Sequence, residues 1–289
     1  MAKLFHFTKC DSFINILKSK TFWLNDSTMM KDSTDRTFGA TYLKKVIAEA
    51  NEEQTPYLYK LKKKNVLKTE SFTMWPMYIM CFCRQNNLHL WEQFADKERG
   101  LAFEVDISYM QNKLKSQFES RLGQVKEKGF RGESNFFKVE NVRYDNEENL
   151  LAWIEHVCKY FNISAKRSER DILALLQAMT SGLIKGGTFS IEAETRLYYF
   201  ETETPTLLVE NDKSPLQRAL YSSQYEQYKS ALEHYTKRIS RVELKLDEIW
   251  GSELIPRVIL GRDCAWTVEE MREKLGKNKL SNTRIERMD

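Results

Sequence analysis

Apolar and polar residues alternate along several short segments of the chain, in the way that is typical of half-buried strands. The clearest case is residues 188–200, TFSIEAETRLYYF. One face of this strand would be mainly apolar, and the other would carry Glu192, Glu194 and Arg196. We expect further strands at residues 4–7, 21–24, 77–83, 101–106, 136–145, 205–210 and 257–261.

Helical spacing of apolar residues marks the segments between these strands. Helices are predicted over residues 147–161, over residues 171–184 before the pair Gly186-Gly187, and over about 215–236. Thr267 and Glu270 form a capping box that begins one more helix. The pattern predicts one α+β domain, with a helical insertion at about 146–186 and a C-terminal helix and tail at about 267–289.

Length and composition indicate a globular protein. The chain has 289 residues, of which 42% are hydrophobic, and this is enough for a packed core. The formal net charge of +4 is too small to indicate nucleic acid or an anionic membrane as partner. Because no segment has the length and apolarity of a signal peptide or a membrane span, we expect a cytoplasmic protein without a membrane partner.

The common signatures of catalytic and metal sites are absent from the sequence. It contains no G-x-G-x-x-G, P-loop, H-E-x-x-H or G-x-S-x-G segment. The five cysteines are scattered, which favours reduced thiols. Cys81 and Cys83 have no second pair at ligand spacing, so buried thiols are favoured over a metal site, and we expect no metal.

Several segments taken in order resemble a known bacterial family. They are LFHFTKCDSFINILKSKTFWLND, MCFCRQNNLHLWEQFADKERGLAFEVD, NVRYD, FSIEAETRLYY and RVILG. The series is similar to the family catalogued as domain of unknown function 2971. The opening segment, with His6 and Thr8 before a helix, also resembles ADP-ribosyltransferases acting on nucleic acid and RNA phosphotransferases.

This second resemblance implies a fold and a cofactor. The fold would be a split, mainly antiparallel sheet of ADP-ribosyltransferase-like type, with segregated helices and with NAD bound as substrate in its cleft. Glu194 and Glu192 would be the catalytic carboxylates. The residues implied in NAD binding are His6, Thr8, Asn25, Tyr78 and Arg196. Such enzymes also have a hydroxyl or an aromatic residue on a central strand. The nearest candidates here are Cys83 and Tyr78, and because Cys83 lacks a hydroxyl the resemblance is incomplete at this position.

The implied chemistry is transfer of ADP-ribose from NAD to a macromolecular acceptor, protein or nucleic acid, by a bacterial toxin or an anti-phage effector. Glu194 would stabilise the cationic transition state, and Glu192 would take a proton from the acceptor. The alternative is a non-catalytic module that binds a nucleotide or a protein in the same cleft. A solvated row of charges is the simplest structural explanation of Glu192 and Arg196.

Two structural predictions follow from this hypothesis. The strand with His6 should lie near the strand with Glu194, and both side chains should face one cleft. Trp91 should pack its short helix against the sheet and should not stack on a ligand.

Overall fold

The structure is a computed structural model, which describes residues 3–27, 33–64, 77–114, 116, 137–164, 169–200 and 241–289. The strands are β1 (Lys3–Thr8), β2 (Thr21–Asp26), β3 (Met77–Cys83), β4 (Leu101–Asp106), β5 (Phe137–Asn141), β6 (Arg143–Tyr144), β7 (Ile184–Lys185), β8 (Glu194–Phe200), β9 (Arg241–Lys245), β10 (Arg257–Leu260) and β11 (Arg284–Arg287). The helices are α1 (Cys10–Ser19), α2 (Ser33–Glu49), α3 (Pro56–Lys63), α4 (Leu88–Phe94), α6 (Leu150–Ser164), α7 (Glu169–Leu183), the 3₁₀ helix η3 (Gly187–Glu192) and α10 (Val268–Gly276).

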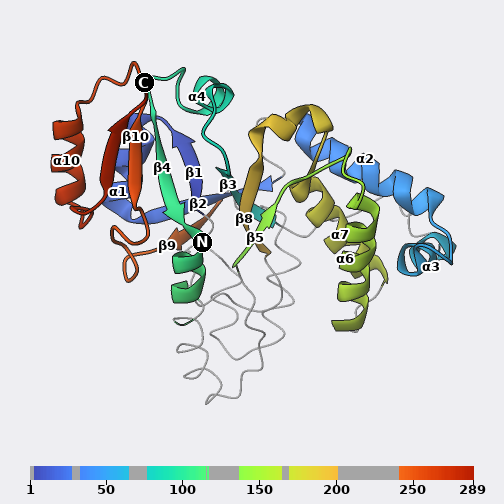
Figure 1. The fold of residues 1–289 in the computed structure, drawn as a ribbon. Helices are drawn as coiled ribbons and strands as arrows, with labels where there is room; N and C mark the ends of the chain where they lie inside the picture. Colours follow the sequence, from blue (N-terminus) through green and yellow to red (C-terminus); the bar gives the residue numbers. More distant parts are fainter. Residues whose placement is uncertain are drawn as a thin grey trace, which may run out of the picture.

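A nine-stranded, mainly antiparallel sheet runs through the described part of the molecule, which confirms the α+β class (Figure 1). Strand β3 lies at its centre and pairs along one edge with β8, which in turn pairs with β5. The other edge of β3 pairs with two strands. Its start contacts β2 through Ile79 and Asn25, and its end contacts β1 through Cys83 and Phe5.

The sheet therefore divides at β3 into two arms. One arm is β2–β9, and the other is β1–β4–β10–β11, in which only the β10–β11 pair is parallel. Helix α1 connects the two arms, and aromatic rings fill the interior between them. Phe22 contacts Phe82 and Phe103 at centroid distances of 6.3 and 6.2 Å, and Phe13 lies 5.1 Å from Phe103.

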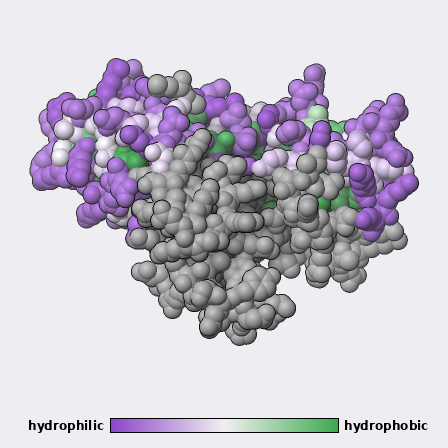
Figure 2. Space-filling model, turned by 90° about the horizontal axis from the view of Figure 1, so that it is seen from below, coloured by the Kyte–Doolittle hydropathy of each residue, from purple (hydrophilic) through white to green (hydrophobic). Residues whose placement is uncertain are grey.

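The apolar residues form two main cores on opposite sides of β3 and β8. The first core lies between the arms and includes α1 and α10. The second core packs α2, α3, α6 and α7 against Met77, Ile79 and Tyr198 (right side of Figure 1). Seen from below, the surface of the described residues is mainly hydrophilic, with small hydrophobic areas (Figure 2). No helix in the described residues is both long and apolar enough to cross a bilayer.

Two helices, α6 and α7, form where the sequence predicts helices. Helix α7 ends at Leu183, and the short strand β7 precedes Gly186 and Gly187, so these glycines do not end the helix directly. The capping box of Thr267 and Glu270 is confirmed at the start of α10. The predicted tail after this helix includes β11, which pairs with β10. The predicted strand at 205–210 and helix at 215–236 lie outside the described residues.

The connection from α4 to β4 is a left-handed turn. Asp96, Lys97 and Glu98 have φ angles of 52°, 55° and 64°, an arrangement that costs free energy for residues with a Cβ. The turn is held where Gly261 approaches the Glu98 carbonyl so closely that a Cβ there would lie 2.0 Å from the oxygen. Helix α4 therefore ends at Phe94, several residues before Gly100.

Candidate functional site: a buried ion-pair network

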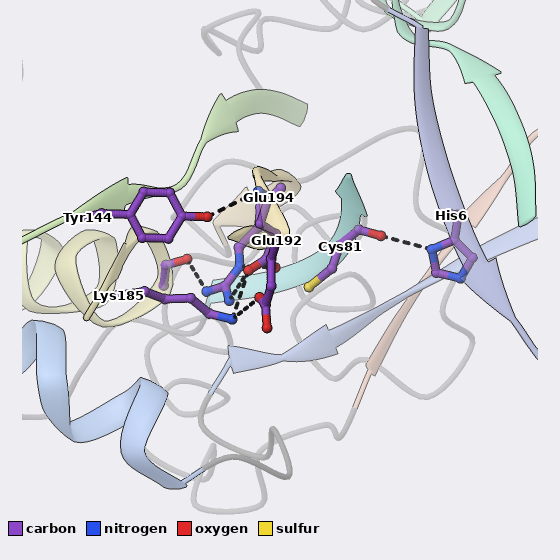
Figure 3. Close-up of polar contacts among 8 residues, drawn as sticks. His6, Cys81, Tyr144, Lys185, Glu192 and Glu194 are labelled. Carbon is purple, nitrogen blue, oxygen red and sulfur yellow. Dashed lines mark hydrogen bonds and ion pairs between the residues drawn. The ribbon is translucent and has the colours of Figure 1, made fainter. Parts of the chain in front are cut away.

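Four charged side chains form a buried network at the start of β8 (Figure 3). Arg196 donates to both carboxylate oxygens of Glu194, from Nε at 2.7 Å and from Nη2 at 3.0 Å. Lys185 Nζ lies 2.8 Å from Glu192 and 3.0 Å from Glu194. The four residues, which we call the Glu194 network, are 1% to 6% exposed. Two cations and two carboxylates give the network a formal charge of zero.

The backbone around these residues differs from the predicted strand. Residues Gly187–Glu192 form the 3₁₀ helix η3, Ala193 follows with a φ of 44°, and β8 begins only at Glu194. Glu192 is thus not in a strand row with Glu194 and Arg196. The left-handed residue Ala193 turns the chain so that the carboxylates of Glu192 and Glu194 both reach Lys185, which follows α7 in β7.

Hydrogen bonds from neighbouring elements fix the network in place. Arg196 Nη1 donates to the Gly182 carbonyl oxygen of α7 at 2.5 Å, which links β8 to the second core. The Glu194 backbone N–H donates to the Tyr144 hydroxyl at 3.1 Å. The Cys81 thiol interacts with the Glu194 carboxylate from the neighbouring strand β3, and burial raises the pKa of this thiol well above its usual value.

The Glu194 carboxylate is ionised throughout the physiological pH range. Burial alone would raise its pKa, but the charges of Arg196 and Lys185 and the hydrogen bonds from Arg196 outweigh burial. The result is a pKa lowered to about 2. Because both oxygens of the carboxylate already accept from buried cations, the charge is neutralised within the fold and faces no open space in the described residues.

This lowered pKa predicts a defined loss of stability in acid. A carboxyl group with a pKa of about 2 when folded and about 4.5 when unfolded contributes roughly 3 kcal/mol to stability. Since the folded pKa is the lower one, the contribution is complete above about pH 4.5 and is lost as the pH falls towards 2. In urea unfolding at a series of pH values, Glu194→Gln should therefore remove about this much of the decline between pH 4.5 and 2. An equal decline in both proteins would contradict the assignment.

The strand register separates His6 from Glu194. Paired residues share a face of the sheet, so Phe5, Cys83 and Glu194 lie on one face. His6 follows Phe5 and lies on the other face, where its ring contacts Phe82 at 5.8 Å. The strands of His6 and Glu194 both adjoin β3, as predicted, but the prediction that the two side chains face one cleft is wrong.

His6 is partly buried and neutral. Its Nδ1 lies 2.8 Å from the Cys81 carbonyl oxygen, and because a carbonyl only accepts, Nδ1 is the protonated nitrogen (Figure 3). Burial lowers the pKa of His6, and the hydrogen bond to Cys81 only partly opposes this effect. Cys81 thus contacts both predicted groups, His6 through its carbonyl and Glu194 through its thiol.

The remaining predicted site residues also lie on the two opposite faces of the sheet. Thr8 and Tyr78 share the face of His6 and are buried, with Tyr78 stacked on Tyr199 at 6.0 Å. Asn25 pairs with Ile79, so it shares the face of Glu194 and Arg196, and it is exposed. The seven predicted site residues therefore occupy two sides of the sheet.

Sequence reasoning missed Lys185 and Tyr144. Lys185 is the single charge in the stretch Leu183–Gly187, and a cation in such an apolar setting requires a carboxylate partner when it is buried. Tyr144 stands in the motif NVRYD, but no local pattern connects its hydroxyl with a backbone N–H that lies 50 residues further along the chain.

The cysteines are all free, as predicted. Burial raises the pKa of Cys83 to about 12, so its thiol is protonated at neutral pH. Among the described residues, no three His, Cys, Asp or Glu side chains are arranged so that they could hold a metal ion.

Comparison with known proteins gives one family. Residues 90–197 match the family described as "Protein of unknown function (DUF2971)". The DUF2971 match begins at Leu90 in α4 and ends at Leu197 in β8, so it contains the whole Glu194 network and leaves out β1, β2 and β3. No curated protein and no solved structure matches the chain. The resemblance to ADP-ribosyltransferases therefore stays a prediction.

Proposed function

We propose that the chain is a non-catalytic protein-binding module and that the Glu194 network is part of its scaffold. The main support for this proposal is that the Glu194 carboxylate is already bound within the fold. Glu194 is 3% exposed, it accepts hydrogen bonds from Arg196, and it forms an ion pair with Lys185. A carboxylate that stabilises a cation on a substrate has to face that substrate. Within the described residues, Glu194 faces only other side chains of its own fold.

The same contacts weaken the case for a nucleotide as ligand. A nucleotide phosphate needs cations or backbone N–H groups that point towards it. Lys185 and Arg196, the two cations of the Glu194 network, are bound to Glu192 and Glu194 at 3.0 Å or less. Binding of a phosphate there would leave two buried carboxylates unpaired, which is costly.

Three exposed apolar side chains lie on α4 and η3, the elements beside the network. Leu88 and Phe94 on α4 are 55% and 46% exposed, and Ile191 on η3 is 53% exposed. The side chain of Asn87, the residue before α4, donates to the Ile191 carbonyl oxygen of η3 at 3.0 Å. Helix α4 and η3 both lie at the top of Figure 1. We call Leu88, Phe94 and Ile191 the α4/η3 surface. A protein partner that covers both elements would bury all three side chains.

The Glu194 network gives this surface a rigid base. Glu192, the last residue of η3, is bound to Lys185, and the Lys185 ammonium also lies 5.2 Å from the Phe189 ring. These contacts hold η3 against β7, and the hydrogen bond from Asn87 to the Ile191 carbonyl oxygen holds η3 beside α4, so the α4/η3 surface is formed before a partner arrives. Preorganisation of this kind reduces the entropic cost of binding.

Site-specific photo-crosslinking tests the proposal. A photoreactive phenylalanine derivative is placed at position 88 or at position 191, and crosslinked products are analysed in the native cells. We expect both positions to yield the same protein partner, and we expect the double variant Leu88→Ser/Ile191→Ser to lose at least tenfold in capture by the probe at position 94.

Position 151 supplies the matched control, because Leu151 is also apolar and 38% exposed but belongs to α6. It should not yield this partner, and the double variant should keep the melting temperature of the wild type. Equal products from positions 88, 191 and 151, or no product from the first two, would contradict a binding role of the α4/η3 surface.

Transfer of ADP-ribose from NAD to a protein or nucleic acid, by a toxin or an anti-phage effector, is the second candidate. It is favoured by the placement of β1 and β8 on either side of β3 and by the ionised state of Glu194. In this case Arg196 and Lys185 would have to release Glu194 when NAD binds. The need to break a buried network makes this candidate the weaker one.

A further inference from the structure

Two cysteines from opposite ends of the chain meet near the surface. The sulfurs of Cys10 and Cys264 are 3.5 Å apart, although 254 residues separate the two positions. Cys10 is the first residue of α1 and is partly exposed, whereas Cys264 follows β10 and is 6% exposed. The other three cysteines, Cys81, Cys83 and Cys158, belong to other parts of the fold.

Rigid contacts bring the two sulfurs together. Arg287 of β11 donates from Nη1 to the carbonyl oxygens of Gly261 and Cys264, at 3.0 and 3.1 Å, and so holds the loop after β10. The Cys10 sulfur also lies 3.6 Å from the Arg99 carbonyl oxygen, just after the left-handed turn that follows α4. Two thiols held at van der Waals distance need only a small movement to reach the geometry of a disulfide.

We propose that Cys10 and Cys264 are a modification site, at which a peroxide converts the two thiols reversibly into an intramolecular disulfide. In the first step the Cys264 thiolate attacks one peroxide oxygen, the O–O bond breaks, and a sulfenic acid and, after protonation, one water form. In the second step the Cys10 sulfur attacks the sulfenic sulfur, the S–O bond breaks, and the thiol proton leaves with the hydroxide as a second water. Two thiols and one hydrogen peroxide thus give one disulfide and two waters.

The charges around the pair favour this order of events. The pKa of Cys264 is lowered to about 6, first by the hydrogen bond from Cys10 and then by the Trp266 backbone and the charge of Arg287, against burial and Glu270. The pKa of Cys10 is raised by the same hydrogen bond, by burial, by the coupling to Cys264 and by Asp11 and Asp96. Cys264, and not Cys10, is therefore the cysteine that loses its proton. Because this pKa is lowered, the rate of oxidation should reach half of its maximum near pH 6 and not near pH 9.

Mass spectrometry of the purified full-length chain after treatment with hydrogen peroxide tests the proposal. The chain has five cysteines, and we expect the count of free thiols to fall from five to three. Peptide mapping should show Cys10 linked to Cys264, and dithiothreitol should restore all five thiols. The linked form should also melt at a higher temperature, because the disulfide restricts the unfolded chain.

Variants separate this site from general thiol oxidation. Cys10→Ser and Cys264→Ser should each abolish the linked peptide, whereas Cys158→Ser, at a buried cysteine of α6, should keep it. Mapping of the wild type does not depend on the folding of any variant. Peptides in which Cys10 and Cys264 carry only sulfinic acid, or the same mixture of linked cysteines from folded and urea-unfolded chain, would overturn the proposal.

Discussion

Glu194→Gln is expected to lower the free energy of unfolding by about 3 to 5 kcal/mol, the usual cost of breaking a buried ion pair by removing one partner. The variant keeps the size of the side chain but leaves Arg196, which is 1% exposed, without its carboxylate, and Lys185 without one of two. The amide can still accept hydrogen bonds, so the loss comes mainly from uncompensated charge. Urea unfolding at neutral pH measures it.

Two control variants show whether the loss of stability comes from the buried ion pair. Glu243→Gln breaks the surface pair with Arg241 on β9, whose side chains are 38% and 43% exposed, and should change stability by no more than about 0.5 kcal/mol. The double variant Glu194→Gln/Arg196→Met removes both unlike charges and should cost less than the sum of the two single variants. A loss of under 1 kcal/mol for Glu194→Gln would show that the network does not support the fold.

Trp91→Ala is expected to cost a similar amount, about 3 to 5 kcal/mol, because it leaves a cavity under α4. The Trp91 ring is 1% exposed and meets Phe7 edge to face at 5.3 Å. Its Nε1 donates to the Asn86 side chain at 2.6 Å. The predicted structural role is therefore confirmed, and the melting temperature should fall by roughly 10 °C.

Phe94→Ala is the matched control for Trp91→Ala, since it removes an aromatic ring from the same short helix. Phe94 is 46% exposed, so its loss should cost less than about 1 kcal/mol. Trp91→Phe keeps most of the packing and loses the hydrogen bond, so it should lie between the two. Equal losses for Trp91→Ala and Phe94→Ala would mean that Trp91 does not anchor α4.

The sequence predicts elements that have strong local signals. The buried run of β4 and the capping box of α10 were read correctly, because side-chain burial and capping act over a few residues. The helix η3 was read as a strand. Its alternation continues into β8, and the left-handed residue that separates the two, Ala193, is not a glycine, so no local residue type marks the change of backbone.

The sequence predicts where the charged site lies better than it predicts which side chains meet there. Glu192, Glu194 and Arg196 do meet, but Lys185 completes the network from a separate element. The face of His6 depends on the register between β1 and β3, which the single pair Phe5 and Cys83 defines. A shift by one residue would move His6 to the face of Glu194, and no pattern within either strand specifies that register.

Release of nicotinamide from NAD distinguishes a structural Glu194 network from a catalytic one. The purified chain and its Glu194→Gln variant are each incubated with NAD, alone and with cell extract, at a temperature at which circular dichroism shows both to be folded. We expect no release above the buffer control for either protein, together with a clearly lower melting temperature for Glu194→Gln. If the wild type releases nicotinamide, and Glu194→Gln abolishes this release without changing the melting temperature, the structural role of the Glu194 network is contradicted. That result would favour ADP-ribose transfer as the function.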